Sequence, residues 1–146
     1  MAGGVEQYIQ NVIATPGVRS VLVVLDAEGD CAAAEGPRLL ERCRSVASHV
    51  PTRIVMPCMI YENWLAASPV EGEERTPGQG GWEGPSALAW LKARVTGYKK
   101  TVHQARLTAT LDFDLTASRC PSFGRFLRCV DDLGDGMIAS CTEPPS

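Results

Sequence analysis

Four carboxylates follow two apolar segments of the chain and could together bind a divalent metal ion. Asp26, Glu28 and Asp30 occupy alternate positions after the apolar run 21–25, and Glu62 follows a second apolar segment. Alternate side chains of an extended segment point to the same side, so the first three could face one ligand. Like charges this close repel, and Mg²⁺, which prefers hard oxygen ligands, would relieve the repulsion. The alternative interpretation is a polar turn whose acids stabilise the start of the next helix.

The elements expected around these acids form a unit of strand, helix and strand. The run 21–25 contains only Val and Leu, which is typical of a strand buried on both faces. Segment 35–50 places apolar residues at helical spacing, with Pro37 in the first turn, and a second strand is expected near 53–57. Such a unit implies a parallel sheet with a right-handed crossover. Open α/β sheets bind ligands outside the carboxyl ends of their strands, where the acids are expected.

The rest of the chain is expected to be helical, apart from one long loop. Segment 69–86 consists largely of glycine, proline and acidic residues, so we predict a functional or mobile loop insertion. Ser122 is expected to be the N-cap of the last helix. We predict a single α/β domain over 1–133 and a flexible tail at 134–146. Helices are predicted at 5–15, 61–68, 86–95, 102–111, 114–120 and 122–133.

The composition is that of an ordinary globular domain. The chain has 146 residues, of which 45% are hydrophobic and 21% charged, and it contains no apolar run long enough to span a membrane. Its start lacks the basic and apolar regions of a secretory signal, so we expect a cytoplasmic protein. The six cysteines are scattered without a CxxC pair, which favours reduced, partly buried thiols over disulfides or a zinc site.

Positive charge is concentrated in one part of an acidic chain. The net charge is −3, but segment 91–128 carries eight Lys or Arg residues against two Asp residues. This asymmetry favours a surface that binds phosphate, although a solvated basic helical face would give the same pattern. The candidate residues for binding phosphate or nucleic acid are Lys99, Lys100, His103 and Arg106. No nucleophilic triad is apparent, and Trp64 and Trp90 are expected in the core, whereas Trp82 falls in the loop.

Three stretches of the sequence together carry a family pattern. They are LVVLDAEGDCAAAEGPRLL, IVMPCMIYENWLAAS and GYKKTVHQARLTATLDFDLTASRCPSF, in this order. Together they resemble the Toprim-like proteins of domain-of-unknown-function family 4276. That family shows a D-x-D-like cluster followed by Cys, a Tyr-Glu-x-Trp segment and a closing Tyr-Lys…Gln…Ser-Phe pattern. The resemblance covers about 21–133, and the closing block is its most specific part.

The resemblance implies a truncated Toprim/Rossmann-like parallel sheet with a helical carboxyl-terminal region. It also implies a metal-dependent nuclease or phosphoesterase subunit of a bacterial anti-phage defence system, with Mg²⁺ or Mn²⁺ as cofactor and nucleic acid as substrate. Asp26 and Glu28 match the D-x-D positions, and Glu62 matches the acid of the Tyr-Glu-x-Trp segment. These three are the expected catalytic residues. The expected metal ligands are Asp26, Glu28, Asp30 and Glu62, while Lys99 and Lys100 match a basic position that could hold phosphate.

The chain departs from the family pattern at its start. Toprim folds open with a strand that carries a glutamate in a V-E-G-x-x-E-like segment, whereas this sequence begins with an expected helix. A second polypeptide, such as an ATPase, could supply this part; otherwise the chain is a degenerate copy or the sequence is truncated. A sheet without its first strand exposes an edge, so we expect a partner protein or an oligomer. The rival hypothesis is a non-catalytic adaptor or nucleic-acid-binding subunit with a degenerate Toprim fold, and a small-molecule phosphatase is a third.

Overall fold

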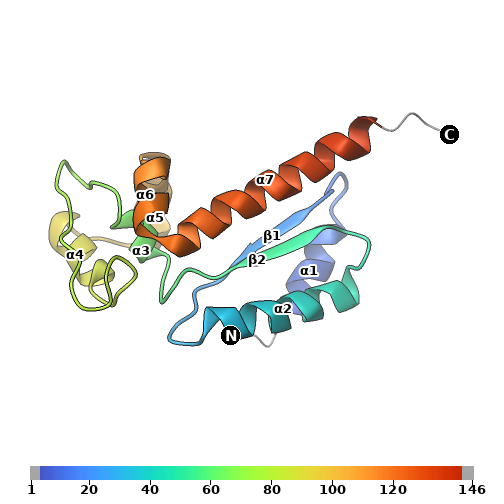
Figure 1. The fold of residues 1–146 in the computed structure, drawn as a ribbon, viewed down its shortest axis with the longest axis horizontal. Helices are drawn as coiled ribbons and strands as arrows, with labels where there is room; N and C mark the ends of the chain where they lie inside the picture. Colours follow the sequence, from blue (N-terminus) through green and yellow to red (C-terminus); the bar gives the residue numbers. More distant parts are fainter. Residues whose placement is uncertain (1–3, 143–146) are drawn as a thin grey trace. The chain divides into compact units, whose positions relative to one another are not determined.

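The computed structural model describes the backbone of residues 4–142 and the side chains of residues 4–135 (Figure 1). Within this part, the chain is a mixed α/β protein with a two-stranded parallel sheet and seven helices. The mixed α/β class agrees with the prediction. The elements are α1 Val5–Ile13, β1 Val21–Val24, α2 Ala32–Val46, β2 Thr52–Val55, α3 Glu62–Leu65, α4 Ala87–Arg94, α5 Lys100–Ala109, α6 Phe113–Arg119 and α7 Pro121–Thr142.

The predicted unit of strand, helix and parallel strand is present. β1 and β2 pair in parallel from Val21 opposite Thr52 to Val24 opposite Val55, and α2 connects them. The expectation that β1 is buried on both faces is wrong, because the side chain of Val24 is 37% exposed. The described sheet has only two strands, so β1 has a strand neighbour on one side alone.

The chain divides into two compact units. Among the residues that the structure describes, the first contains 4–25, 31–56 and 125–142, and the second contains 26–30 and 57–124. In the first unit, α1 and α2 pack on the sheet around buried side chains that include Ile9, Leu39, Cys43 and Ile54. Figure 1 shows α7 on the opposite side of the strands from α2. The two strands therefore lie between α2 on one side and α7 on the other.

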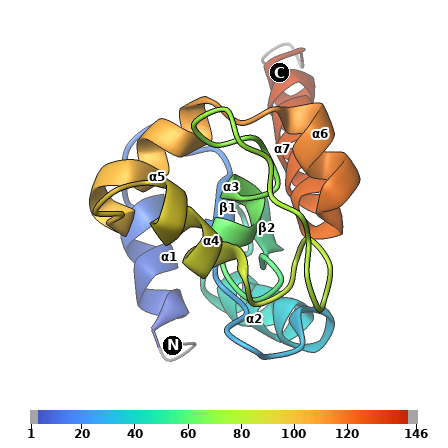
Figure 2. The same ribbon diagram turned by 90° about the vertical axis from the view of Figure 1, so that its left-hand side faces the viewer.

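The second unit is built from short helices around a buried aromatic and aliphatic core. Figure 2 shows α3, α4 and α5 beside one another, and α3 contacts both of the others. Trp64, which is 1% exposed, packs edge-on against Phe123, so its predicted place in the core is confirmed. Trp90 is half-buried at the margin of the cluster that contains Leu65 and Leu91.

Segment 69–86, predicted as a loop insertion with little to bury, is built into the second unit. Arg75 is 3% exposed and donates hydrogen bonds to Ser86 Oγ and to the Trp82 carbonyl. The guanidinium groups of Arg75 and Arg119 lie 5.4 and 4.2 Å from the centre of the Trp82 ring. Asn63 Nδ2 donates to the Gly84 carbonyl at 3.0 Å. Cation–π contacts and hydrogen bonds thus replace the apolar side chains that the loop lacks.

The last helix differs from the prediction at both ends. α7 begins at Pro121, so Ser122 lies inside the helix and is not its N-cap. Instead, the Ser122 backbone N–H and hydroxyl both donate to Glu83 Oε1, and the Trp64 indole N–H donates to Ser122 Oγ at 2.7 Å. α7 continues to Thr142, so the predicted tail at 134–146 starts inside a helix, and 143–146 lie outside the described residues. Over the described residues, none of the helices is long and apolar enough to cross a membrane.

The cysteines whose side chains are described are free thiols, as the sequence predicts. Cys43, Cys120 and Cys129 are buried, whereas Cys31 and Cys58 are exposed. Burial raises the pKa of Cys120 to about 12, which keeps this thiol protonated and unreactive at neutral pH. Cys141 falls outside the described side chains.

Candidate functional site

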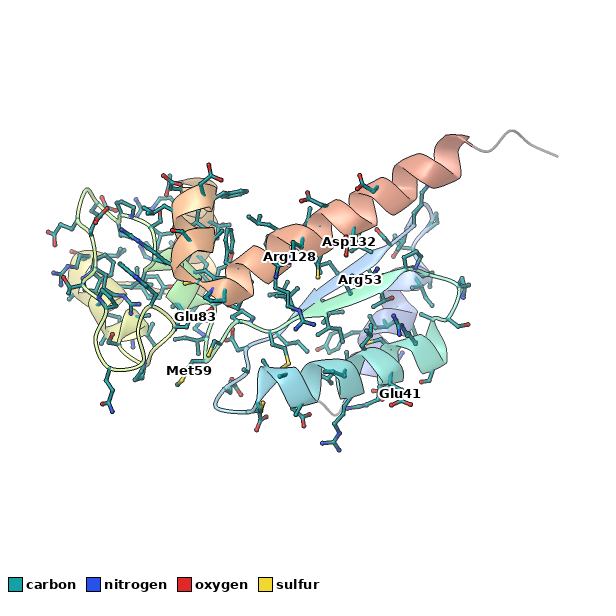
Figure 3. All side chains as sticks on the ribbon, in the orientation of Figure 1. Glu41, Arg53, Met59, Glu83, Arg128 and Asp132 are labelled. Atoms are coloured by element: carbon teal, nitrogen blue, oxygen red, sulfur yellow. The ribbon has the colours of Figure 1, made fainter. Side chains whose placement is uncertain are left out.

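The acidic segment 26–30 follows β1 and pairs with the segment that follows β2. The Ala27 N–H donates to the Pro57 carbonyl at 3.3 Å, and the Glu28 N–H donates to the Met59 carbonyl at 2.9 Å. Met59 is labelled in Figure 3. Asp26 Oδ1 accepts a hydrogen bond of 2.8 Å from the backbone N–H of Tyr61. These bonds hold the Asp26 carboxylate beside the start of α3, within the second unit.

Glu62, the first residue of α3, is a fully buried carboxylate with an incomplete set of hydrogen bonds. Its side chain is 0% exposed. Oε1 accepts hydrogen bonds from the Tyr98 hydroxyl at 3.0 Å and from Gln104 Nε2 at 3.1 Å. Oε2 is buried without a hydrogen-bond donor. A buried charge lowers stability by several kcal/mol unless a counter-charge or hydrogen-bond donors compensate it. A cation beside Oε2 would provide this compensation.

The ammonium group of Lys100 lies between the two carboxylates. Lys100 Nζ is 3.5 Å from Glu62 Oε2 and 3.9 Å from Asp26 Oδ2. Partial burial raises the pKa of Asp26, and the nearby carboxylates of Glu62 and Glu28 raise it further, against the opposing effects of the Tyr61 N–H and Lys100. Among the described ion pairs, Lys100 is the one cation that contacts both carboxylates, and its side chain is 52% exposed.

Two residues without a predicted role hold Glu62 in place. Burial, with the neighbouring carboxylate of Glu62, raises the pKa of Tyr98 well above its usual range, so the phenol remains a hydrogen-bond donor at neutral pH. Gln104 comes from α5, one turn after Lys100, and its amide donates to the same oxygen. Both residues belong to the closing block of the family pattern, and that block was the signal that could have identified them.

The structure joins Asp26 and Glu62 through Lys100, whereas Glu28 acts on Asp26 through its charge alone and Asp30, among the described contacts, touches neither carboxylate. Glu28 and Gly29 have φ angles of 49° and 95°, and the Asp30 N–H donates to the Ala27 carbonyl at 2.8 Å. The chain therefore turns where the sequence suggested an extended segment, and alternate side chains do not share a side. No group of three or more His, Cys, Asp or Glu side chains suited to a metal ion occurs within the described residues.

The predicted phosphate-binding residues have different surroundings. Lys100 contacts the two carboxylates, and Arg106 Nη2 forms an ion pair of 3.0 Å with Glu71 Oε1. His103 Nδ1 accepts a hydrogen bond of 3.0 Å from the backbone N–H of Lys99, and its ring stacks on Tyr98. The Lys99 side chain is exposed. Of this set, Lys100 alone contacts the carboxylates of Asp26 and Glu62.

The oxygen donors of this site fit a small divalent cation. Mg²⁺ is commonly held by one or two protein carboxylates, with waters and substrate phosphates completing its octahedral shell. Asp26 Oδ2 and Glu62 Oε2 both face the Lys100 ammonium, and Oε2 lacks a hydrogen-bond donor. The half-exposed Lys100 side chain can turn toward solvent when another cation takes its place. The two carboxylates and Lys100 are called the carboxylate site below.

A scan against models of protein families found no match for the chain, and searches of curated proteins and of solved structures found none either. The resemblance to Toprim-like proteins therefore stays a prediction. The function has to be inferred from the carboxylate site itself, whose charges and contacts are defined by residues of the second unit.

Proposed function

We propose that the chain is a Toprim-like, Mg²⁺- or Mn²⁺-dependent nuclease subunit, of the kind expected in bacterial anti-phage defence, and that Asp26 and Glu62 are its metal ligands. One observation carries this proposal: Glu62 is fully buried, yet its Oε2 has no hydrogen-bond donor and faces a second carboxylate across a displaceable ammonium. If the side chain at position 62 served packing alone, an amide or an apolar residue there would destabilise the fold less than a buried carboxylate does. Burying it without a full set of donors is what a cation-binding role requires.

The residues around the carboxylates have distinct parts in the proposed chemistry. A bound divalent ion would polarise the scissile phosphate and stabilise charge on the leaving oxygen. Tyr98 and Gln104 fix the orientation of Glu62 by donating to Oε1, which leaves Oε2 available. Lys100, once released from the carboxylates, is placed to hold a phosphate oxygen of the substrate. We propose that a partner chain or a second copy supplies the acidic residue that the opening strand of the Toprim pattern would carry.

A non-catalytic adaptor or nucleic-acid-binding subunit is the second candidate, and the Lys100 contacts favour it. The ammonium already lies within 3.9 Å of both carboxylates, so it can neutralise part of their charge without a metal. In that case Glu62 is the buried acid of a structural ion-pair network. The two candidates differ in the expected response to removal of Lys100.

Titration with Mn²⁺ by calorimetry tests the proposal directly. The native chain should bind Mn²⁺ saturably, whereas Asp26→Asn and Glu62→Gln should weaken binding by at least about tenfold, because each removes one of two ligands. Lys100→Met should tighten binding, because it removes the competing cation. Glu28→Gln and Asp30→Asn serve as matched controls, and both should keep the native affinity.

Two outcomes would reject the nuclease proposal in favour of the adaptor. One is the absence of saturable binding up to millimolar metal in the native chain. The other is a Lys100→Met variant that unfolds more easily and still binds no metal. Circular dichroism of each variant establishes whether its fold is intact before the titration is interpreted.

A further inference from the structure

The first unit contains a cavity lined by basic residues, separate from the carboxylate site of the second unit. An open cavity of about 640 Å³ is lined by Arg53, Arg125, Arg128, Cys129, Asp131 and Asp132. Figure 3 shows Arg53 on β2 and both Arg128 and Asp132 on α7. All six lining residues belong to the first unit. Three guanidinium groups thus line one cavity, although Arg53 is separated from the other two by about half of the chain.

Two of the three arginines of this cavity are available for a ligand, whereas Arg53 Nη1 donates to the Thr52 carbonyl at 3.2 Å. Arg125 and Arg128 are exposed, and their spacing of three residues places them on the same face of α7. Among the described contacts, neither forms an ion pair. The nearest approach of Arg53 to a carboxylate is 3.9 Å, from Nε to Asp132 Oδ2. Guanidinium groups present planar forks of donors that match the oxygens of a phosphate.

We propose that Arg53, Arg125 and Arg128, named the arginine site here, bind the phosphates of a nucleic-acid backbone. The choice of nucleic acid rests on the proposed function. The cavity is open and its lining contains no aromatic side chain on which a base could stack, so the contacts are restricted to phosphates. The expected binding is therefore independent of base sequence and strongly dependent on salt.

The two aspartates of the cavity allow a second test, in which a substitution should strengthen binding instead of weakening it. Asp131 and Asp132 lower the positive charge of the lining, and Asp132 lies beside Arg53. A phosphate that approaches Arg53 has to compete with the Asp132 carboxylate. Replacing Asp132 with Asn should therefore strengthen binding, whereas loss of the arginines should weaken it.

Fluorescence anisotropy of a labelled single-stranded oligonucleotide, with the full chain in EDTA, measures this site without any metal. The slope of log K against log salt is negative, and each lost phosphate contact reduces its magnitude by about 0.7 for single strands. R125Q/R128Q should therefore reduce the magnitude of the slope by about 1.4. The matched control is R38Q/R44Q, which removes the same charge from exposed positions of α2. Asp132→Asn should tighten binding more than Glu41→Gln, a control at an exposed acid of α2 (Figure 3).

The arginine site is overturned if R38Q/R44Q lowers affinity and slope as much as R125Q/R128Q does, since net charge alone would then explain binding. It is also overturned if inorganic phosphate, at an equal concentration of phosphate groups, competes as well as unlabelled oligonucleotide, which would indicate a site for a small anion. Failure of the proposed nuclease is a separate result. A native chain that binds no Mn²⁺, but whose oligonucleotide binding in EDTA still depends on Arg125 and Arg128, would reject the nuclease and keep the arginine site.

Discussion

At the scale of single residues, Glu62 is the buried acid around which the carboxylate site is arranged. Its buried carboxylate depends on Tyr98 and Gln104 for hydrogen bonds and on Lys100 for charge. These three residues lie close together in the sequence and belong to α5 or the turn before it. A change in any of them therefore acts on Glu62, and the consequences can be separated by measuring stability and metal binding in the same variants.

Tyr98→Phe should lower the free energy of unfolding by about 1–3 kcal/mol, because it leaves a buried carboxylate oxygen with one donor fewer. Urea denaturation followed by fluorescence measures the change. Tyr8→Phe is the matched control, since the Tyr8 side chain is 75% exposed, and it should leave stability within about 0.5 kcal/mol of the native value. Equal stability of the two variants would contradict the dependence of Glu62 on Tyr98.

Asp26→Asn should raise the melting temperature at pH 7. The pKa of Asp26 is raised in the folded state, so folding favours its protonated form, and the ionised form costs stability above that pKa. The native chain should recover this stability as the pH falls through the raised pKa. An amide keeps an acceptor for the Tyr61 N–H and carries no charge at any pH.

Melting curves of both proteins between pH 7 and pH 4 test this expectation. The difference, on the order of 2 °C at pH 7, should narrow toward pH 4. A variant that melts below the native chain at pH 7 would show that the attraction of Lys100 outweighs burial at Asp26.

At the scale of elements, the long loop and the last helix stabilise each other. Glu83 accepts hydrogen bonds from the N–H and hydroxyl of Ser122 in the first turn of α7, and Trp64 donates to the same hydroxyl. First-turn N–H groups have no partner within their own helix, so the loop provides a cap that the local sequence does not. Figure 3 labels Glu83 near the start of α7.

Glu83→Ala should lower the free energy of unfolding by about 1 kcal/mol, because it removes the cap of α7. Glu83→Gln should recover much of the loss, since its side-chain oxygen can still accept. Glu74→Ala is the control in the same loop. The Glu74 side chain is 59% exposed, so its ion pair with Arg119 should contribute little to the free energy of unfolding. Thermal unfolding compares the three, and an equal effect of Glu74→Ala and Glu83→Ala would argue against the cap.

At the scale of the whole molecule, the sheet and the apolar groove beside it are the features from which we expect one copy of the chain to bind another. It has two described strands, and such a ribbon is marginal unless other surfaces cover it. An apolar groove of about 430 Å³ runs along β1 and α1, lined by residues that include Tyr8, Val12 and Val24. Their exposed fractions are 75%, 41% and 37%, which is unusual for a contiguous apolar surface.

The native chain should therefore self-associate at micromolar concentration, as measured by size-exclusion chromatography with light scattering. Tyr8→Lys with Val12→Lys should shift it to the mass of a monomer, because charges would then line the groove. Gln10→Lys, at an exposed polar position of α1, should have no effect. A native chain that runs as a monomer would remove the support for a second copy at this groove.

The sequence by itself determined the features that depend on local spacing. Apolar runs and helical periodicity predicted β1, α2 and β2 and their parallel order, because element geometry fixes the directions of successive side chains. The same spacing identified Asp26 and Glu62 as acids that follow strands. It could not reveal the turn at Glu28, where a positive φ ends the extended segment.

Only the tertiary structure decided which distant residues meet. Tyr98 and Gln104 reach Glu62 across 36 and 42 positions of the chain, Arg53 joins the arginines of α7, and Glu83 caps a helix from within a loop. Such contacts follow from packing and from the need to satisfy buried polar groups, and no local period encodes them. The elements and the charged residues of the carboxylate site could therefore be predicted from the sequence, whereas the donors that hold Glu62 and the assembly of the arginine site could not.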